Sequence, residues 1–262
     1  MAGLSEAELL ALALLCLAAF AAGFVDSIAG GGGLIQLPAL MLVLPGYPLA
    51  MLFGTNKIAS IFGTGTAVIK YSSKLSLPWK VMLPTAGAAL IGSGTGALVA
   101  SSIPNETMRP IALLLLVAAS GYILWKRDLG SVEKPEPPFR DQLVIGILSG
   151  LVIGFYDGVF GPGTGSFLIF VFVSFLGLSF LRATASAKII NFATNFAAIL
   201  VFLKGGNVLF QYALPMAFFN MAGGFTGSHM AMLRGNKFVN NFFLFSVGLV
   251  VVKLIWDMVS SF

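Results

Sequence analysis

The chain has 262 residues, of which 58% are hydrophobic and only 10% are charged, and its mean hydropathy is +0.96. A soluble domain of this length carries far more charge on its surface. The composition therefore excludes a soluble globular protein and indicates a polytopic membrane protein. The formal net charge of +5 would suggest nucleic-acid binding in a soluble chain. Here the basic residues gather in short loops, where they act as topology signals, and we expect no nucleic-acid partner.

The rare reactive residue types exclude several kinds of site. Cys16 is the only cysteine, so we expect no disulfide and no cysteine-based metal site. His229 is the only histidine, and a single histidine does not make a metal site. Glu6 and Glu8 precede the first apolar run without any basic residue, so this run is expected to remain as a helix rather than to be removed as a signal peptide. No metal and no cofactor are predicted.

Apolar segments follow one another along the whole chain, separated by glycine, proline and charged residues. In the first half they cover roughly 8–29, 34–44, 49–71, 78–101 and 108–125. In the second half they cover roughly 142–160, 165–180, 182–203, 208–232 and 238–257. Crossing the hydrocarbon layer takes about 20 apolar residues. Most segments meet this length and the 34–44 segment does not, which predicts an all-α polytopic membrane protein with about 8–10 transmembrane segments.

A polar stretch divides the chain into two halves. Residues 126–141 read KRDLGSVEKPEPPFRD, and their charges and prolines indicate an exposed linker. We therefore predict a first membrane repeat over 1–125, a cytoplasmic linker over 126–141 and a second membrane repeat over 142–262.

The two halves repeat the same pattern at a constant offset of 131 residues. The clearest signal is an aspartate followed by a glycine run, GFVDSIAGGGGLIQLP over 23–38 and GFYDGVFGPGTGSFLI over 154–169. Further residues match at this offset without any gap: Asp26 and Asp157, Gly30 and Gly161, Gly32 and Gly163, Lys57 and Lys188, Pro84 and Pro215. Shared apolar composition does not produce matched charges, prolines and glycines in one register, so the sequence indicates an internal duplication.

The placement of lysine and arginine predicts how the halves insert. With the N-terminus outside and five segments in each half, most basic loop residues fall on the inside, as the positive-inside rule requires. Five is an odd number, so the second half enters from the opposite face. This is an inverted-topology repeat, an architecture that many secondary transporters share. Whether the first two segments of each half both span, or dip in and return as a hairpin, stays open, because both options leave the flanking loops on the same side.

The glycine runs are the predicted tips of these first segments, and two of the segments are expected to be short or broken. Glycine lets backbone N–H groups turn toward a ligand, and the helix that follows adds positive partial charge at its N-terminus. Together these features form an anion site without a side-chain cation. The alternative is that the glycines only allow close helix packing. A phosphate-loop interpretation is weak because neither run ends in Gly-Lys-Ser/Thr. The candidate tip residues are Gly30, Gly31, Gly32, Gly33, Gly161, Gly163 and Thr164.

Two lysines stand inside apolar helical segments and begin polar stripes. Asn191 and Asn195 follow Lys188 at i+3 and i+7, on one helical face. Asn56 precedes Lys57, and Ser60 and Thr64 occupy the equivalent later positions of the first half. The functional interpretation is a cationic, hydrogen-bonding wall for an anion. The structural alternatives are that each lysine pairs with Asp26 or Asp157, or that it reaches toward the membrane interface.

The aspartates of the two motifs have two candidate roles. An ionisable residue within the membrane is costly and commonly functional, so Asp26 and Asp157 are candidate proton carriers. They are equally candidates for orienting the glycine tips by hydrogen bonds to backbone N–H groups. The two aspartates need not act alike, because inverted halves can differ.

With these motifs in view, the chain resembles the TauE/SafE family, which covers sulfite and organosulfonate exporters and permeases of the 4-toluene sulfonate uptake type, and within it the YfcA-like membrane transporters. The resemblance rests on GFVDSIAGGGGLIQLPAL, GTNKIASIFGTGTAVIKY, GFYDGVFGPGTGSF and ATASAKIINFATNFAA and covers nearly the whole chain. It implies a multi-pass permease of the cytoplasmic (inner) membrane for small anions such as sulfite or sulfoacetate, coupled to a proton gradient. It also implies that the glycine tips and the lysine stripes line the central pathway.

The predicted function is secondary-active transport of a small anion by alternating access, with sulfite, organosulfonates or sulfur-containing carboxylates as candidate substrates. An anion channel and a non-transporting scaffold subunit are the alternatives. An enzyme is not predicted, because the chain offers no nucleophile with a base and no metal ligands. The expected partners are the substrate anion and the lipid bilayer, and homo-oligomerisation stays open. The predicted substrate-binding residues are Gly30, Gly31, Gly32, Gly33, Asn56, Lys57, Gly161, Gly163, Thr164, Lys188, Asn191 and Asn195.

Overall fold

The computed structural model describes residues 6–125 and 135–260, and over these residues every regular element is a helix. The helices are α1 (Glu6–Ala29), α2 (Gly33–Val43), α3 (Leu49–Ser72), α4 (Trp79–Ser102), α5 (Asn105–Trp125), α6 (Phe139–Val159), α7 (Thr164–Leu176), α8 (Phe180–Lys204) and α9 (Phe210–Ser260). The prediction of an all-α polytopic fold is confirmed. The first part of the predicted linker, residues 126–134, lies outside the described residues.

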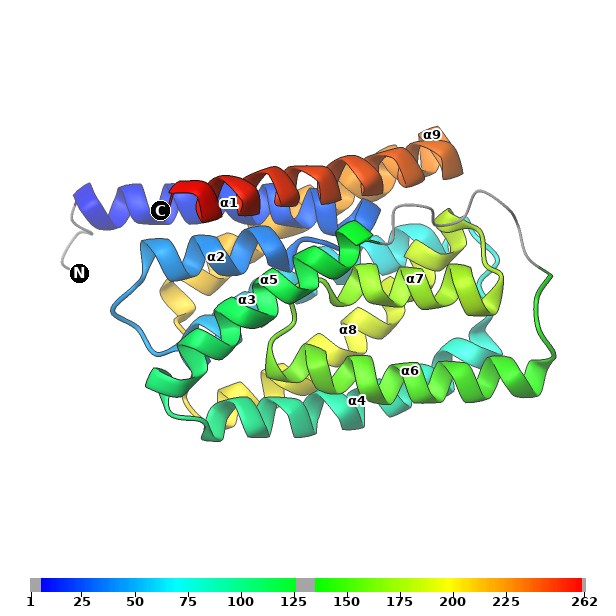
Figure 1. Ribbon diagram of the computed structural model, residues 1–262, viewed down its shortest axis with the longest axis horizontal. Helices are drawn as coiled ribbons and strands as arrows, with labels where there is room; N and C mark the ends of the chain where they lie inside the picture. Colours follow the sequence, from blue (N-terminus) through cyan, green and yellow to red (C-terminus); the bar gives the residue numbers. More distant parts are fainter. Residues whose placement is uncertain (1–5, 126–134, 261–262) are drawn as a thin grey trace.

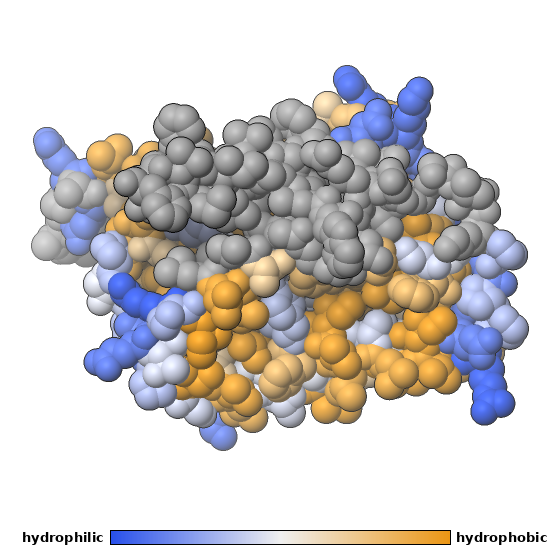
Figure 2. Space-filling model, viewed as in Figure 1, coloured by the Kyte–Doolittle hydropathy of each residue, from blue (hydrophilic) through white to orange (hydrophobic). Residues whose placement is uncertain are grey.

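Four helices of the described chain are long and apolar enough to cross a membrane, namely α1, α4, α6 and α8. Apolar side chains cover much of the described surface between two hydrophilic ends, as Figure 2 shows. Helix α3 is equally long, with 24 residues, but it buries polar groups such as Asn56, Lys57 and Thr64 inside the protein. The bundle therefore presents an apolar exterior while it keeps polar side chains in its interior.

Helix positions repeat at the offset found in the sequence. Helices α2 and α7 begin 131 residues apart, as do α3 and α8, and α4 and α9. Helix α9 contains a break at Gly235, whose backbone is non-helical with φ of 70°. The residue after this break, Asn236, matches the first residue of α5, Asn105, at the same offset. The ten apolar segments thus correspond to nine described helices, of which the last joins two segments.

The two short helices form hairpins with the helices before them. Helix α2 has 11 residues and α7 has 13, which gives lengths of about 16 and 20 Å at 1.5 Å per residue. Neither reaches across a hydrocarbon layer about 30 Å thick. Helix α2 turns back beside α1, and α7 turns back beside α6 (Figure 1). The glycine runs are the turns of these hairpins, and they lie inside the bundle rather than at its ends.

In each half, one helix packs against a helix of the other half. Helix α4 of the first half packs along α6 of the second half, and α9 packs along α1. Glycines permit these close approaches: a methyl group added at Gly92 would overlap the backbone oxygen of Leu151, and one added at Gly223 would overlap that of Phe20. Small residues at such crossings let membrane helices approach closely. Two packed groups result, one built on α1, α3 and α9 and the other on α4, α6 and α8.

Basic residues gather at one end of this bundle. Lys70 and Lys74, at the end of α3, lie in the same surface hollow as Leu181, at the start of α8. The neighbouring Arg182 forms an ion pair of 3.1 Å with Glu136, just before α6. Lys70, Lys74 and Arg182 therefore lie close together at this end of the bundle.

The crossing of α4 and α6 gives a direct test of the packing. We expect Gly92→Val to destabilise the protein by about 1–3 kcal/mol, because the added side chain must displace the α6 backbone. Gly94→Val is the matched control: it lies on the same helix, and a Cβ there meets nothing within 4 Å. Thermal unfolding in detergent measures both. Equal melting temperatures for the two variants would show that α4 and α6 are not packed as described.

Candidate functional site

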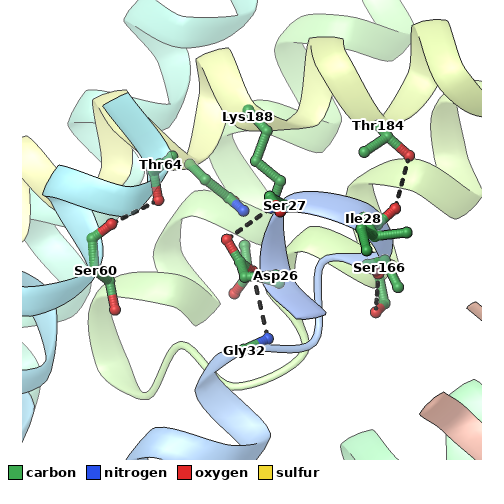
Figure 3. A network of polar contacts seen from close by, with 12 residues as sticks. Asp26, Ser27, Ile28, Gly32, Ser60, Thr64, Ser166, Thr184 and Lys188 are labelled. Carbon is green, nitrogen blue, oxygen red and sulfur yellow. Dashed lines mark hydrogen bonds and ion pairs between the residues drawn. The ribbon is translucent and has the colours of Figure 1, made fainter. Parts of the chain in front are cut away.

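The first glycine tip is shaped by Asp26. Gly30 adopts a left-handed backbone with φ of 77°, which L side chains rarely tolerate, and its N–H donates to the Asp26 carbonyl at 2.9 Å. The Asp26 side chain also accepts a hydrogen bond of 3.4 Å from the N–H of Gly32 (Figure 3). This contact is the tip-orienting role considered for Asp26. Helix α2 then begins at Gly33.

The second tip reaches a similar shape by other contacts. Gly161 and Gly163 both have positive φ, of 98° and 86°. The Thr164 hydroxyl donates to the Gly161 carbonyl at 2.7 Å, and the Tyr156 hydroxyl donates to the Pro162 carbonyl at 2.6 Å. The described residues show no equivalent hydrogen bond from a backbone N–H to the side chain of Asp157. The Asp26 side chain therefore contacts the backbone of its own tip, whereas no such contact is found for Asp157.

The two tips touch each other at the centre of the bundle. A Cβ on Gly30 would lie 2.6 Å from the backbone nitrogen of Ser166, and one on Gly33 would lie 3.0 Å from Cα of Pro162. The Ser166 hydroxyl donates to the Ala29 carbonyl at 3.0 Å. Close packing, the alternative to ligand binding, is thus one real role of these glycines. It also brings the N-termini of α2 and α7 to the same place.

Two ion pairs cross between the halves beside the tips. Lys57 of α3 binds Asp157 of α6, with 2.6 Å between Nζ and Oδ2. Lys188 of α8 binds Asp26 of α1, with 2.8 Å between the corresponding atoms (Figure 3). Each pair is the repeat equivalent of the other. The lysines therefore do pair with the aspartates, as one of the structural alternatives held, and each lysine selects the aspartate of the opposite half.

A cavity lies between the tips and the two lysine helices. Its empty space is about 450 Å³, part of which is open to the outside. Five pairs of lining residues occupy equivalent positions in the two repeats, so both halves contribute. The lining consists of Ala22, Asp26, Gly30, Gly32, Gly33, Asn56, Lys57, Ser60, Thr64, Asp157, Gly161, Thr164, Gly165, Asn191, Asn195 and Asn220.

Most predicted site residues are in this lining, and three are not. Gly31 lies on the outer side of the first tip, where a Cβ would meet only side chains 3.9 to 4.0 Å away. Gly163 is buried at the start of α7 and serves as its N-cap residue. Lys188 is fully buried behind Asp26, with no exposed side-chain surface. The structure brings the other predicted binding residues and both aspartates together around one space.

Side-chain amides dominate the polar part of the lining. Asn56 and Asn191 are 5% and 7% exposed, and the Oδ1 atom of each is buried without a hydrogen bond. Asn195 is 6% exposed, and among the described residues no hydrogen bond from its side chain is found. Buried amides normally have partners. All three amides line the cavity, and no hydrogen bond to another described residue engages their Nδ2–H groups. The Oδ1 atoms can accept from water, and the Nδ2–H groups can donate to an anion.

Asn220 was missed by the sequence prediction, although it lines the cavity. Its amide nitrogen donates to the Gln36 side chain at 2.7 Å and to the Ala19 carbonyl at 3.1 Å. Gln36 in turn donates to the Asn56 carbonyl at 3.2 Å. This network ties α1, α2, α3 and α9 together on one side of the cavity. An asparagine within the apolar stretch 212–225 was the available signal.

The chemistry of this lining suits a small anion. Lys57 supplies an ammonium group, the amides supply N–H donors, and the N-termini of α2 and α7 add positive partial charge. Oxyanions are bound in proteins by such donors. Among the described residues, no group of three His, Cys, Asp or Glu side chains is placed to hold a metal ion.

Comparison with known proteins finds relatives that are named as probable membrane transporters. The chain is 39% identical over 248 residues to the probable membrane transporter protein ORF9 of a Sinorhizobium species, covering 94% of this chain and 93% of that protein. It is 32% identical to a probable membrane transporter protein of Haemophilus influenzae, covering 94% and 95% of the two chains. It is 31% identical to the probable membrane transporter protein YfcA of Escherichia coli, covering 95% and 91%.

No solved structure shows a significant match to this chain. The family model described as sulfite exporter TauE/SafE matches residues 15–254, nearly the whole chain. The family and these relatives carry the names of membrane transporters rather than enzymes. The chain is a polytopic membrane protein that belongs to the TauE/SafE family.

Proposed function

We propose that this protein is a secondary-active transporter of small anions, with sulfite and organosulfonates as its substrates. The observation that carries the proposal is the cavity in which Lys57, three asparagine side-chain amides and two helix N-termini converge between the halves. Such donors bind oxyanions without a metal. The name of the family model points to sulfite among the small oxyanions.

Alternating access is supported by the relation between the equivalent helices α3 and α8. Lys70 and Lys74, at the end of α3, share a hollow with Leu181, at the start of α8. At the opposite end, the Thr55 hydroxyl near the start of α3 accepts a hydrogen bond from the N–H of Leu209, just beyond α8. The two helices therefore run in opposite directions, which favours an inverted-topology repeat. Transporters of this architecture bind substrate where the repeats meet and rock one repeat against the other.

From the contacts around the cavity we infer which two groups of helices move against each other. The two packed groups, one with α1, α3 and α9 and one with α4, α6 and α8, meet where α3 packs along α8, at the tips and at the crossed ion pairs. Rocking about this line of contact would open the cavity to each side in turn. The N-termini of α2 and α7 would hold the anion, and Lys57 would supply the full positive charge.

The proposed location is the cytoplasmic membrane, with the basic end of the bundle inside. The positive-inside rule favours the face that carries Lys70, Lys74 and Arg182. The family and the apolar helices support a multi-pass membrane protein, and the particular membrane is part of the proposal.

Flux through the purified protein tests the proposal directly. Reconstituted into proteoliposomes, the protein should move sulfite, sulfoacetate, taurine or thiosulfate with saturable kinetics, and a pH gradient should change the rate. Flux that does not saturate and ignores the gradient would favour an anion channel. No flux or binding of any of these anions would contradict the proposal.

The double variant K57Q/D157N tests the site within that assay. Removing both partners avoids leaving one buried charge unpaired, a change that commonly costs about 3–5 kcal/mol. We expect the variant to fold and to lose at least about tenfold in anion affinity, because a hydrogen bond to a charged group is worth about 1.5–3 kcal/mol. Lys80→Gln, at the exposed start of α4, is the control and should keep normal affinity. A K57Q/D157N variant that binds like the wild type would remove Lys57 from the site.

The binding and structural roles of the asparagines can be distinguished by mutation, because their side chains differ in hydrogen bonding. Asn191→Ala removes an amide that lines the cavity and whose Nδ2–H donors engage no other described residue, so we expect weaker anion binding with an unchanged melting temperature. Asn220→Ala breaks hydrogen bonds to Gln36 and Ala19 and should lower the melting temperature, since a lost buried partner costs about 1–3 kcal/mol. The two variants are compared by anion titration and thermal unfolding. A destabilised Asn191→Ala with intact affinity would assign Asn191 to structure.

A further inference from the structure

The two crossed ion pairs are equivalent by sequence but differ in their access to the cavity. Both members of the Lys57–Asp157 pair line it, whereas Lys188 of the other pair does not. Lys188 has no exposed side-chain surface. An anion in the cavity can therefore reach Lys57 directly and cannot reach Lys188.

The two aspartates also differ in how firmly they are held. Asp26 has two partners, the Lys188 ammonium at 2.8 Å and the Gly32 N–H at 3.4 Å. For Asp157, the described residues offer one, the Lys57 ammonium at 2.6 Å. If Asp26 lost its negative charge, its hydrogen bond with the Gly32 N–H, which orients the first tip, would weaken. Asp157 does not orient the second tip in this way, because the hydroxyl groups of Tyr156 and Thr164 hydrogen-bond to the backbone of that tip.

Gly161 sets the space beside the Lys57–Asp157 pair. A Cβ at this position would lie 3.1 Å from Nζ of Lys57 and 3.3 Å from Oδ1 of Asp157. Glycine therefore leaves both charged groups open toward the tip and the N-terminus of α7. An oxyanion bound at that N-terminus would contact Lys57 and would stand against the carboxylate of Asp157.

The net charge of the site determines whether an anion can bind without a compensating positive charge. The cavity and its pairs contain two carboxylates and two ammonium groups, which cancel. The charged groups around Asp157 are Lys57 from α3, Asp26 from α1 and Lys188 from α8, and the described cavity lining takes no charged residue from α4 or α7. The Tyr156 hydroxyl is engaged with Pro162. An anion added to this neutral, weakly solvated site leaves one net negative charge, which is costly away from water.

We propose that Asp157 carries the proton that accompanies the anion, and that Asp26 does not. The proposal rests on the proposed function and assigns its coupling step to one carboxylate. A proton from water binds the Asp157 carboxylate, the Lys57 ammonium is released from the pair, and the anion takes its place. The occupied site is then neutral again for a singly charged anion. The Lys188–Asp26 pair stays closed throughout and holds the first tip.

Asp157→Asn should mimic the protonated carboxyl and leave Lys57 without its partner until an anion arrives. In detergent, sulfite and sulfoacetate binding to the wild type should weaken as pH rises, by up to about tenfold per pH unit for one linked proton. The Asp157→Asn variant should lose this additional pH dependence and should bind at high pH at least as tightly as the wild type. The titration of the anion itself cancels in the comparison, because both proteins bind the same anion.

Anion rescue separates the two aspartates. Sulfite should raise the melting temperature of Asp157→Asn more than that of the wild type, because it replaces the missing partner of Lys57. The matched variant Asp26→Asn leaves Lys188 unpaired where no anion can reach, so sulfite should give it no extra rescue. Asp141→Asn, at the exposed start of α6, controls for loss of one carboxylate and should match the wild type.

The outcomes are distinct for the two proposals. If the wild type neither binds nor moves any of the tested anions, the proposed function fails. If the wild type transports but Asp157→Asn keeps the full pH dependence of the wild type, the coupling assignment is overturned. Sulfite rescue of Asp26→Asn that equals the rescue of Asp157→Asn would also overturn it. Should Asp26→Asn fail to fold, the comparison of Asp157→Asn with the wild type and with Asp141→Asn still decides.

Discussion

The crossed ion pairs are the constraint on which the interior of this protein depends. Four ionisable side chains stand inside an apolar bundle, and burying any one of them alone would be strongly unfavourable. Pairing Lys57 with Asp157 and Lys188 with Asp26 makes their burial tolerable. Because each pair joins the two halves, neither half can satisfy its own charges. The duplication therefore requires the halves to assemble face to face, and the cavity forms where they do.

This arrangement explains why the glycine runs are where they are. The aspartates lie at the ends of α1 and α6, and the chain must turn at once to bring α2 and α7 back. Positive φ at Gly30 and Gly161 makes those turns, and the absence of side chains lets the tips touch. The same contact between the tips therefore serves both packing and binding, because it directs the N-termini of α2 and α7 toward one cavity.

The fold was predictable from the sequence to a large extent, because hydropathy and the constant offset determine helix positions in both halves. The composition of the site was predictable in part. Helical periodicity places Lys188 and Asn191 on one face of α8, but it does not say that Asp26 will stand between Lys188 and the cavity. Asn220 escaped because its repeat equivalent is Ala89, so the duplication gave no signal there. Such features depend on neighbouring helices rather than on local pattern.

Departures from the repeat therefore carry the chemistry that symmetry alone would not provide. Two equal ion pairs open to the cavity would offer an anion two competing cationic positions. Lys57 is almost fully buried but lines the cavity, whereas Lys188 does not, which leaves a single cationic position in the lining. The Asn220–Gln36 network stiffens only the side of the first tip. The frame is symmetric enough to rock between two faces, and its interior is asymmetric enough to bind one anion in one place.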